Sequence, residues 1–199
     1  MPYCDDKRAI FLHVPKTAGT FVKDLFRIRR FDDPDPDVRP SPQHLTCEQL
    51  RQRIGDKKYD HYYKFTFIRN PWARILSSYY WRTTLPRKRE APPLIEFIEL
   101  VARTVPERNY YALEFGEHFI PQTEYSRDVD EVFRFEEIEV GIHALAERFK
   151  VKVGRLAARE PKPSDRYWKF YDERSRRLLG ETYAEEIEQF GFTFGGHGL

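Results

Sequence analysis

Residues 8–20 read RAIFLHVPKTAGT, and this stretch decides how the whole chain is interpreted. The apolar run 8–14 predicts a short buried strand. Residues 15–20 are small or hydroxylated apart from Lys16, which predicts a loop, and apolar residues at helical spacing after Thr20 predict a helix. Backbone N–H groups at such a strand–loop–helix junction attract anions. The stretch therefore predicts a phosphate or sulfate loop, with an ordinary turn and an exposed lysine as the alternative.

A second stretch, residues 62–77, is also expected to form a strand followed by a helix, with an arginine at the junction. The run 62–68 (YYKFTFI) predicts another strand, and Asn70 and Pro71 are suited to the N-cap and first turn of a helix. Arg69 then stands at the end of the strand, where ligands bind in open α/β sheets. We therefore expect Arg69 to contact an anion.

The remaining elements indicate the fold class. A third strand is expected at 131–135, and helices are expected to open at Thr46, where Gln49 completes a capping-box pattern, and to span 94–104, 142–149 and 173–190. The proline-rich segment 31–43 is expected to be a surface loop. Strands that alternate with helices predict an α/β fold with a parallel sheet, and no linker divides residues 1–199, so we expect a single domain.

The amino-acid composition excludes several classes of protein and of binding partner. Of the 199 residues, 40% are hydrophobic, enough for a packed core, and 34 basic against 32 acidic residues leave a net charge of +2. This balance excludes binding of nucleic acid by bulk charge, so no nucleic-acid partner is expected. Two cysteines are too few for a disulfide scaffold. No secretory signal and no apolar run of about 20 residues is present, so we expect a cytoplasmic protein without an integral membrane segment.

The chemistry predicted for the two loops is metal-free. A P-loop has the pattern G-x-x-x-x-G-K-[ST], whereas here Lys16 precedes the glycine and the first glycine is missing. Arg69 stands where a magnesium-binding carboxylate would be expected. Asn70, Arg74 and Ser77 are expected near one face of their helix, so Arg69 and Ser77 could converge on one phosphate. The alternative is that Arg69 pairs with an acidic residue while Ser77 faces solvent.

Both loops together resemble a known family. Residues 13–20 (HVPKTAGT) look like the 5′-phosphosulfate loop of the sulfotransferases, and residues 67–81 (FIRNPWARILSSYYW) resemble their 3′-phosphate motif, R-N-P-x-x-R-x-x-S. The variant resembles the carbohydrate branch, sulfotransferase family 2, as do residues 121–123, 134–136 and 171–192. The resemblance implies a P-loop-NTPase-like layered fold, with a central parallel sheet flanked by helices, and 3′-phosphoadenosine-5′-phosphosulfate (PAPS) as donor.

The resemblance also implies roles for individual residues. Lys16 would stabilise the bridging oxygen as the sulfuryl group leaves, because a fixed cation offsets the charge that develops there. The donor-binding residues implied are Pro15, Lys16, Thr17, Ala18, Gly19, Thr20, Arg69 and Ser77. No metal ligand is implied.

An acceptor hydroxyl needs a general base. His44 lies between the two motifs, where several carbohydrate sulfotransferases that the chain resembles place a catalytic histidine. His118 and Glu136 are the next candidates, whereas His13 and His143 are expected to be structural.

We therefore predict a sulfotransferase that moves the sulfuryl group from PAPS to an acceptor hydroxyl, with a carbohydrate as the expected acceptor, by metal-free in-line displacement. The alternatives are a P-loop-type nucleotide or small-molecule kinase, and a noncatalytic module that binds adenosine 3′,5′-bisphosphate or an RNA end. The sequence does not predict the oligomeric state.

Overall fold

The computed structural model describes residues 3–28, 43–83, 92–154, 156 and 162–195. The chain forms two compact units, of which the first holds residues 1–68 and 122–159 and the second holds residues 69–121 and 160–199. The predicted surface loop at 31–43 lies outside the described residues apart from Gln43. The expectation of a single domain over residues 1–199 stays a prediction.

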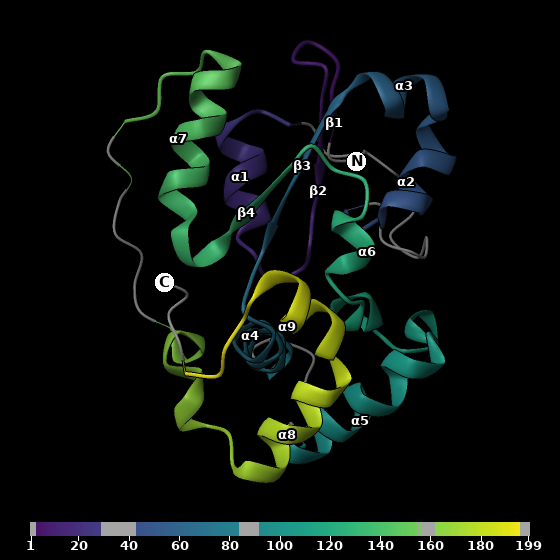
Figure 1. Ribbon diagram of the computed structural model, residues 1–199, viewed down its shortest axis with the longest axis vertical. Coiled ribbons are helices and arrows are strands. Elements are labelled where there is room, and N and C mark those ends of the chain that lie inside the picture. Colours follow the sequence, from purple (N-terminus) through teal and green to yellow (C-terminus); the bar gives the residue numbers. More distant parts are fainter. Residues whose placement is uncertain (1–2, 29–42, 84–91, 155, 157–161, 196–199) are drawn as a thin grey trace. The chain divides into compact units, whose positions relative to one another are not determined.

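A mixed sheet forms the centre of the first unit (Figure 1). Within the described residues its strands run in the order β1 (Tyr3–Cys4), β2 (Ala9–Leu12), β3 (Tyr63–Ile68) and β4 (Glu131–Arg134). β2, β3 and β4 are parallel, and β1 is antiparallel to β2. The three predicted strands and the α/β class are thus confirmed. β1 was not predicted, because a two-residue strand leaves no periodic pattern.

Helices flank this sheet. On one side lie α1 (Gly19–Leu25) and α7 (Ile138–Phe149), and on the other lie α2 (Cys47–Ile54), α3 (Asp56–His61) and α6 (Thr123–Ser126) (Figure 1). Alternate strand residues point to the same face of a sheet. Accordingly, Phe11, Phe65 and Phe67 form one buried cluster with apolar residues of α1 and α7. This arrangement agrees with the predicted layered fold.

Local signals set several helix boundaries. Thr46 caps α2 with a capping box: Gln49 N donates to Thr46 Oγ1 over 3.4 Å, and Thr46 N donates to Gln49 Oε1 over 3.1 Å. α7 begins at Ile138, four residues before the predicted start, after the short 3-10 helix η3 (Phe135–Glu137). Gly141 lies in this added turn, where its missing side chain lets the helix approach the sheet closely.

The second unit is helical. Its elements are α4 (Pro71–Thr83), α5 (Leu94–Glu107), η1 (Tyr110–Ala112), η2 (Gly116–Phe119), η4 (Pro163–Lys169), α8 (Glu173–Thr182) and α9 (Ala184–Phe190). Pro71 is the first residue of α4, as predicted, because its missing N–H is not needed in the first turn. α4 contacts η4 and α8, and α5 contacts α8. None of the described helices has the length and apolar character needed to cross a membrane.

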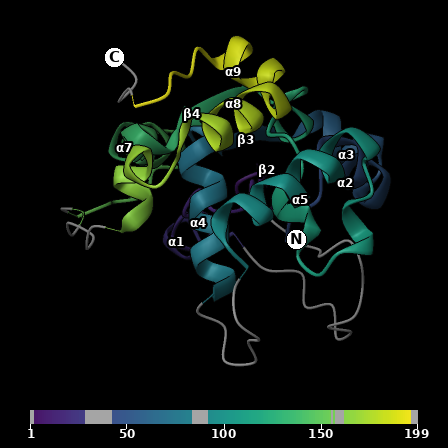
Figure 2. The same ribbon diagram turned by 90° about the horizontal axis from the view of Figure 1, so that it is seen from below.

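The prediction of one helix over 173–190 was wrong. The chain breaks at Tyr183 into α8 and α9, which appear as separate yellow helices in Figure 2. Tyr183 has φ −113° and ψ 28°, outside helical geometry. Its buried hydroxyl donates to the carbonyl oxygen of Phe119 over 2.7 Å. This contact is far away in sequence, so helical periodicity could not reveal it.

We predict that Gly141→Ala destabilises the protein. A Cβ at Gly141 would lie 2.7 Å from Phe67 Cε1 and 2.9 Å from Phe133 Cγ, inside normal contact distance. Overpacking of this kind costs about 1–3 kcal/mol. Urea denaturation should show this loss in the free energy of unfolding. Gly154→Ala is the matched control, because nothing lies within 4 Å of its added Cβ; equal stability of the two variants would contradict the close packing of α7.

Candidate functional site

The loop after β2 has an unusual backbone. Lys16 (φ 70°) and Ala18 (φ 60°) are both in the left-handed region, although neither is glycine. Such residues each cost about 1–3 kcal/mol and tend to occur at functional sites. Alternation between right- and left-handed residues turns successive N–H groups toward a common point, which is how anion-binding nests form. The positive φ angles at Lys16 and Ala18 are compatible with such a nest, and the anion site itself stays a prediction.

Side chains around the loop hold this shape. Thr17 is fully buried, and its hydroxyl donates to the carbonyl oxygen of Val14 over 2.8 Å. It can therefore offer a ligand only its backbone. A Cβ at Gly19 would lie 1.9 Å from Cδ2 and Nε2 of His13, so only glycine fits beside that ring. Lys16 is half-buried and Thr20 is exposed. His13 is buried, as expected of a structural residue.

His44 lies against this loop. Its ring centroid is 4.4 Å from that of His13, and its Nδ1 is 3.0 Å from the His13 carbonyl oxygen. A carbonyl only accepts hydrogen bonds, so the neutral imidazole carries its proton on Nδ1. Nε2 is then left with a lone pair that can accept a proton. The tautomer is the one that a general base requires.

The surroundings of His44 keep it neutral. Burial is the largest cause that lowers its pKa, the hydrogen bond to His13 opposes the shift, and the charges of Lys23 and Lys16 add to it; together they bring the pKa to about 4. At neutral pH the imidazole is therefore unprotonated. The contribution from Lys16 also means that the two predicted catalytic residues lie within electrostatic range of each other in the first unit.

Arg69 is held by polar partners in the second unit. Its guanidinium is 4% exposed, donates to Ser164 Oγ over 3.0 Å and lies 3.5 Å from Asp165 Oδ1. The structure thus contains the acidic partner that the sequence left open as an alternative. Ser77 lies on α4, is half-buried, and has no hydrogen bond among the described residues.

Arg74 points into the second unit, where its neighbour is acidic. Its side chain is fully buried, as is that of Glu186, with Arg74 Nη2 3.7 Å from Glu186 Oε1. Arg74 Nη1 donates to the His118 carbonyl oxygen over 2.9 Å, and the Tyr183 ring lies 5.1 Å away. Arg74 therefore braces α4 against α9 and η2. Spacing alone could not distinguish this role from ligand contact.

The two other candidate bases have different surroundings. His118 is 5% exposed, with Nδ1 2.9 Å from Ser78 Oγ and its ring 4.8 Å from that of Trp81. This packing favours a structural role. Glu136 is exposed in η3.

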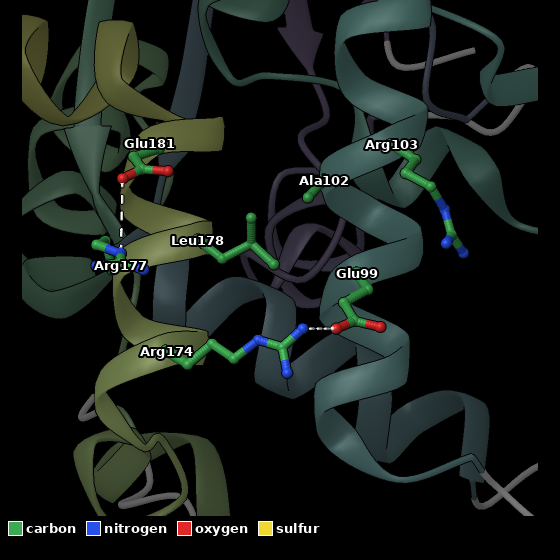
Figure 3. A pocket seen from close by; sticks show the side chains of 7 residues that line it. All are labelled: Glu99, Ala102, Arg103, Arg174, Arg177, Leu178 and Glu181. Carbon is green, nitrogen blue, oxygen red and sulfur yellow. Dashed lines mark hydrogen bonds and ion pairs between the residues drawn. The ribbon is translucent and has the colours of Figure 1, made fainter.

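A groove of about 540 Å³ lies between α5 and α8 (Figure 3). Arg174 Nη2 is 2.5 Å from Glu99 Oε1, and Arg177 Nε is 3.8 Å from Glu181 Oε1. Arg103 points away from α8 in Figure 3. The groove includes none of the residues predicted from the motifs, and two of its arginines are paired with acidic residues. Across the described ranges, no cluster of His, Cys, Asp or Glu suited to a metal ion occurs.

Comparison with known proteins identifies the family. The model of the sulfotransferase family matches residues 1–193. Carbohydrate sulfotransferase 14 of Danio rerio is 30% identical over 84 residues, which are 38% of this chain and 22% of that protein. An uncharacterized protein of Archaeoglobus fulgidus is 31% identical over 95 residues, which are 47% of this chain and 72% of that protein. No solved structure matches the chain significantly.

We predict that Glu186→Ala strongly destabilises the protein, because it leaves the guanidinium of Arg74 buried without its ion pair. Loss of one partner of a buried pair costs about 3–5 kcal/mol. Thermal or urea unfolding measures the change. Glu181→Ala is the control, since its pair with Arg177 is exposed and such pairs contribute at most about 1 kcal/mol. Equal losses of stability in the two variants would contradict a stabilising role for the buried Arg74–Glu186 pair.

Proposed function

Because this chain belongs to the sulfotransferase family, we propose that it transfers the sulfuryl group of PAPS to an acceptor hydroxyl, that of a carbohydrate. The family match over residues 1–193 carries the proposal. The partial similarity to a carbohydrate sulfotransferase supports the acceptor class. The cytoplasmic location expected from the sequence belongs to the same proposal, and the free thiols of Cys4 and Cys47 accord with it.

In the proposed reaction, the acceptor oxygen attacks sulfur in line with the bond to the bridging phosphate oxygen. As the new S–O bond forms, the bridging bond breaks, and its electron pair stays on adenosine 3′,5′-bisphosphate. The acceptor proton passes to Nε2 of His44 and is later released to solvent. Lys16 offsets the negative charge that develops on the leaving oxygen. The products are a sulfate monoester, adenosine 3′,5′-bisphosphate and one proton.

Each assigned role has local support. The left-handed backbone at Lys16 and Ala18 suits the 5′-phosphosulfate, which we assign to residues 15–20. Because the Thr17 hydroxyl is occupied by Val14, the loop would bind mainly through backbone N–H groups. His44 is neutral at physiological pH, as a general base must be.

We assign the 3′-phosphate to Arg69 and Ser77. A buried guanidinium makes strong, directed bonds to phosphate, because little water competes for it. The hydroxyl of Ser77 has no hydrogen bond among the described residues and can donate one. In this structure the carboxylate of Asp165 is paired with Arg69, so a bound phosphate would compete with it for the guanidinium.

This competition gives a test in which two substitutions have opposite signs. Arg69→Ala should weaken binding of adenosine 3′,5′-bisphosphate by about tenfold to a hundredfold, the worth of a charge-assisted bond. Asp165→Asn should tighten it by up to about fivefold, the worth of a partly exposed ion pair. Isothermal titration calorimetry measures both. Arg174→Ala removes an exposed arginine and should leave the affinity unchanged; wild-type affinity in Arg69→Ala would disprove the assigned phosphate site.

Kinetics should separate Lys16 from His44. Lys16→Ala should lower the rate of sulfuryl transfer and weaken donor binding, because Lys16 touches both the donor and the transition state. His44→Ala should leave donor affinity nearly unchanged but lower the rate by about 10²–10⁴-fold. Wild-type kcat/KM should fall on the acid side with a midpoint near 4, well below the ordinary histidine range, because protonated His44 cannot accept a proton. Near-normal turnover of His44→Ala would show that another residue is the general base, and His118 would be tested next.

A further inference from the structure

Lys23 is a buried cation that has no role in the reaction as described so far. It lies on α1, one turn after Gly19, and is 3% exposed. Its Nζ donates to Gln43 Oε1 over 3.0 Å. A buried ammonium has lost most of its hydration and is unfavourable unless its surroundings compensate. The compensating amide belongs to the residue that immediately precedes His44.

The segment Gln43–His44 is held at three described points. Lys23 binds the side chain of Gln43, the His13 carbonyl accepts the Nδ1 proton of His44, and the hydroxyl of Tyr125 donates to the His44 carbonyl oxygen over 3.2 Å. These contacts come from α1, from the residue after β2 and from α6. Of these three contacts, the one from Lys23 brings a charge, and Lys23 lies on the helix that begins in the predicted anion loop.

We propose that Lys23 is a positioning residue for His44: its ammonium fixes the Gln43–His44 segment beside residues 15–20 and so sets how the imidazole is presented to the acceptor hydroxyl. The inference rests on the proposed function, in which His44 accepts the proton. Lys23 itself touches neither donor nor acceptor. Its link to the reaction is the contact with Gln43, which connects α1 to the base.

The charge of Lys23 also affects the pKa of the His44 imidazole. Among the described residues, the titratable or charged groups with recorded interactions at His44 are His13, Lys16 and Lys23, with Tyr125 at its backbone. Both lysines disfavour the imidazolium, and the Lys23 charge is the larger of their two contributions to the depressed pKa of His44. Removal of this charge should therefore raise that pKa, whereas burial would still hold it below the ordinary value. A residue that only filled space would not move this titration.

Lys23→Met tests the inference, because it keeps the length of the side chain and removes the ammonium. We expect the NMR titration midpoint of the His44 ring to rise from about 4, and kcat to fall by up to about a hundredfold, as expected for a misplaced catalytic group. The KM for PAPS should stay within about twofold, because Lys23 does not touch the donor. Lys23→Arg should restore both the midpoint and most of kcat. Lys57→Met, which removes an exposed lysine of α3, is the matched control and should change none of these.

Gln43→Met gives a second route should Lys23→Met fail to fold, because it cuts the contact and leaves both lysines in place. It should lower kcat by about tenfold with little change in the KM for PAPS. Wild-type kcat in Gln43→Met, an unchanged His44 midpoint in Lys23→Met, or equal losses in Lys23→Met and Lys23→Arg would each overturn the inference. If the wild-type protein transferred no sulfuryl group but Lys23→Met still raised the midpoint, the proposed function would fail while the effect of Lys23 on the imidazole stood.

Discussion

Parallel pairing of β2 with β3 is the constraint on which the candidate chemistry depends. Leu12 is paired with Thr66, whose hydroxyl also donates to the Leu12 carbonyl oxygen over 2.7 Å. Because the strands are parallel, both carboxyl ends lie at the same edge of the sheet. The chain leaves β2 into His13 and the 15–20 loop, and leaves β3 into Arg69. The register therefore fixes where both motifs begin, before any of their side chains is considered.

His13 links this backbone constraint to the catalytic candidates. Its ring occupies the space that a Cβ at Gly19 would need, and its carbonyl oxygen accepts the Nδ1 proton of His44. One residue thus holds the shape of the anion loop and sets the tautomer of the proposed base. The His13 ring also packs against that of His44, and burial of the imidazole lowers its pKa. Shape, proton position and pKa at this site therefore have a common origin.

Short sequence patterns predicted those helices and strands that are determined by neighbouring residues in the sequence. The apolar runs predicted β2, β3 and β4, the Thr46–Gln49 pattern predicted the capping box, and Pro71 predicted the start of α4. The break at Tyr183 was missed; this residue has nonhelical dihedral angles and a hydrogen bond to the distant carbonyl of Phe119, and local periodicity reveals neither. Fold class follows from the order of such elements, so the sequence sufficed for it.

The site was predictable by residue type but not by geometry. The motifs named Lys16, His44 and Arg69, and their functional roles remain predictions. Lysine and alanine rarely adopt the left-handed backbone conformation, so the sequence did not indicate it at Lys16 and Ala18. Arg74 and Lys23 are both buried and contact Glu186 and Gln43 respectively, and the sequence motifs predicted neither contact. Contacts between distant segments decide these features, and a single sequence does not reveal such contacts.

The proposed function requires that the chain bind the nucleotide of PAPS without a metal ion. Calorimetric titration of the full chain with adenosine 3′,5′-bisphosphate in EDTA, beside a titration with ATP and Mg²⁺, tests it most directly. We expect clear binding of the bisphosphate in EDTA and much weaker binding of ATP with Mg²⁺. Tight binding of ATP with Mg²⁺ and no binding of the bisphosphate would contradict the account and favour a kinase.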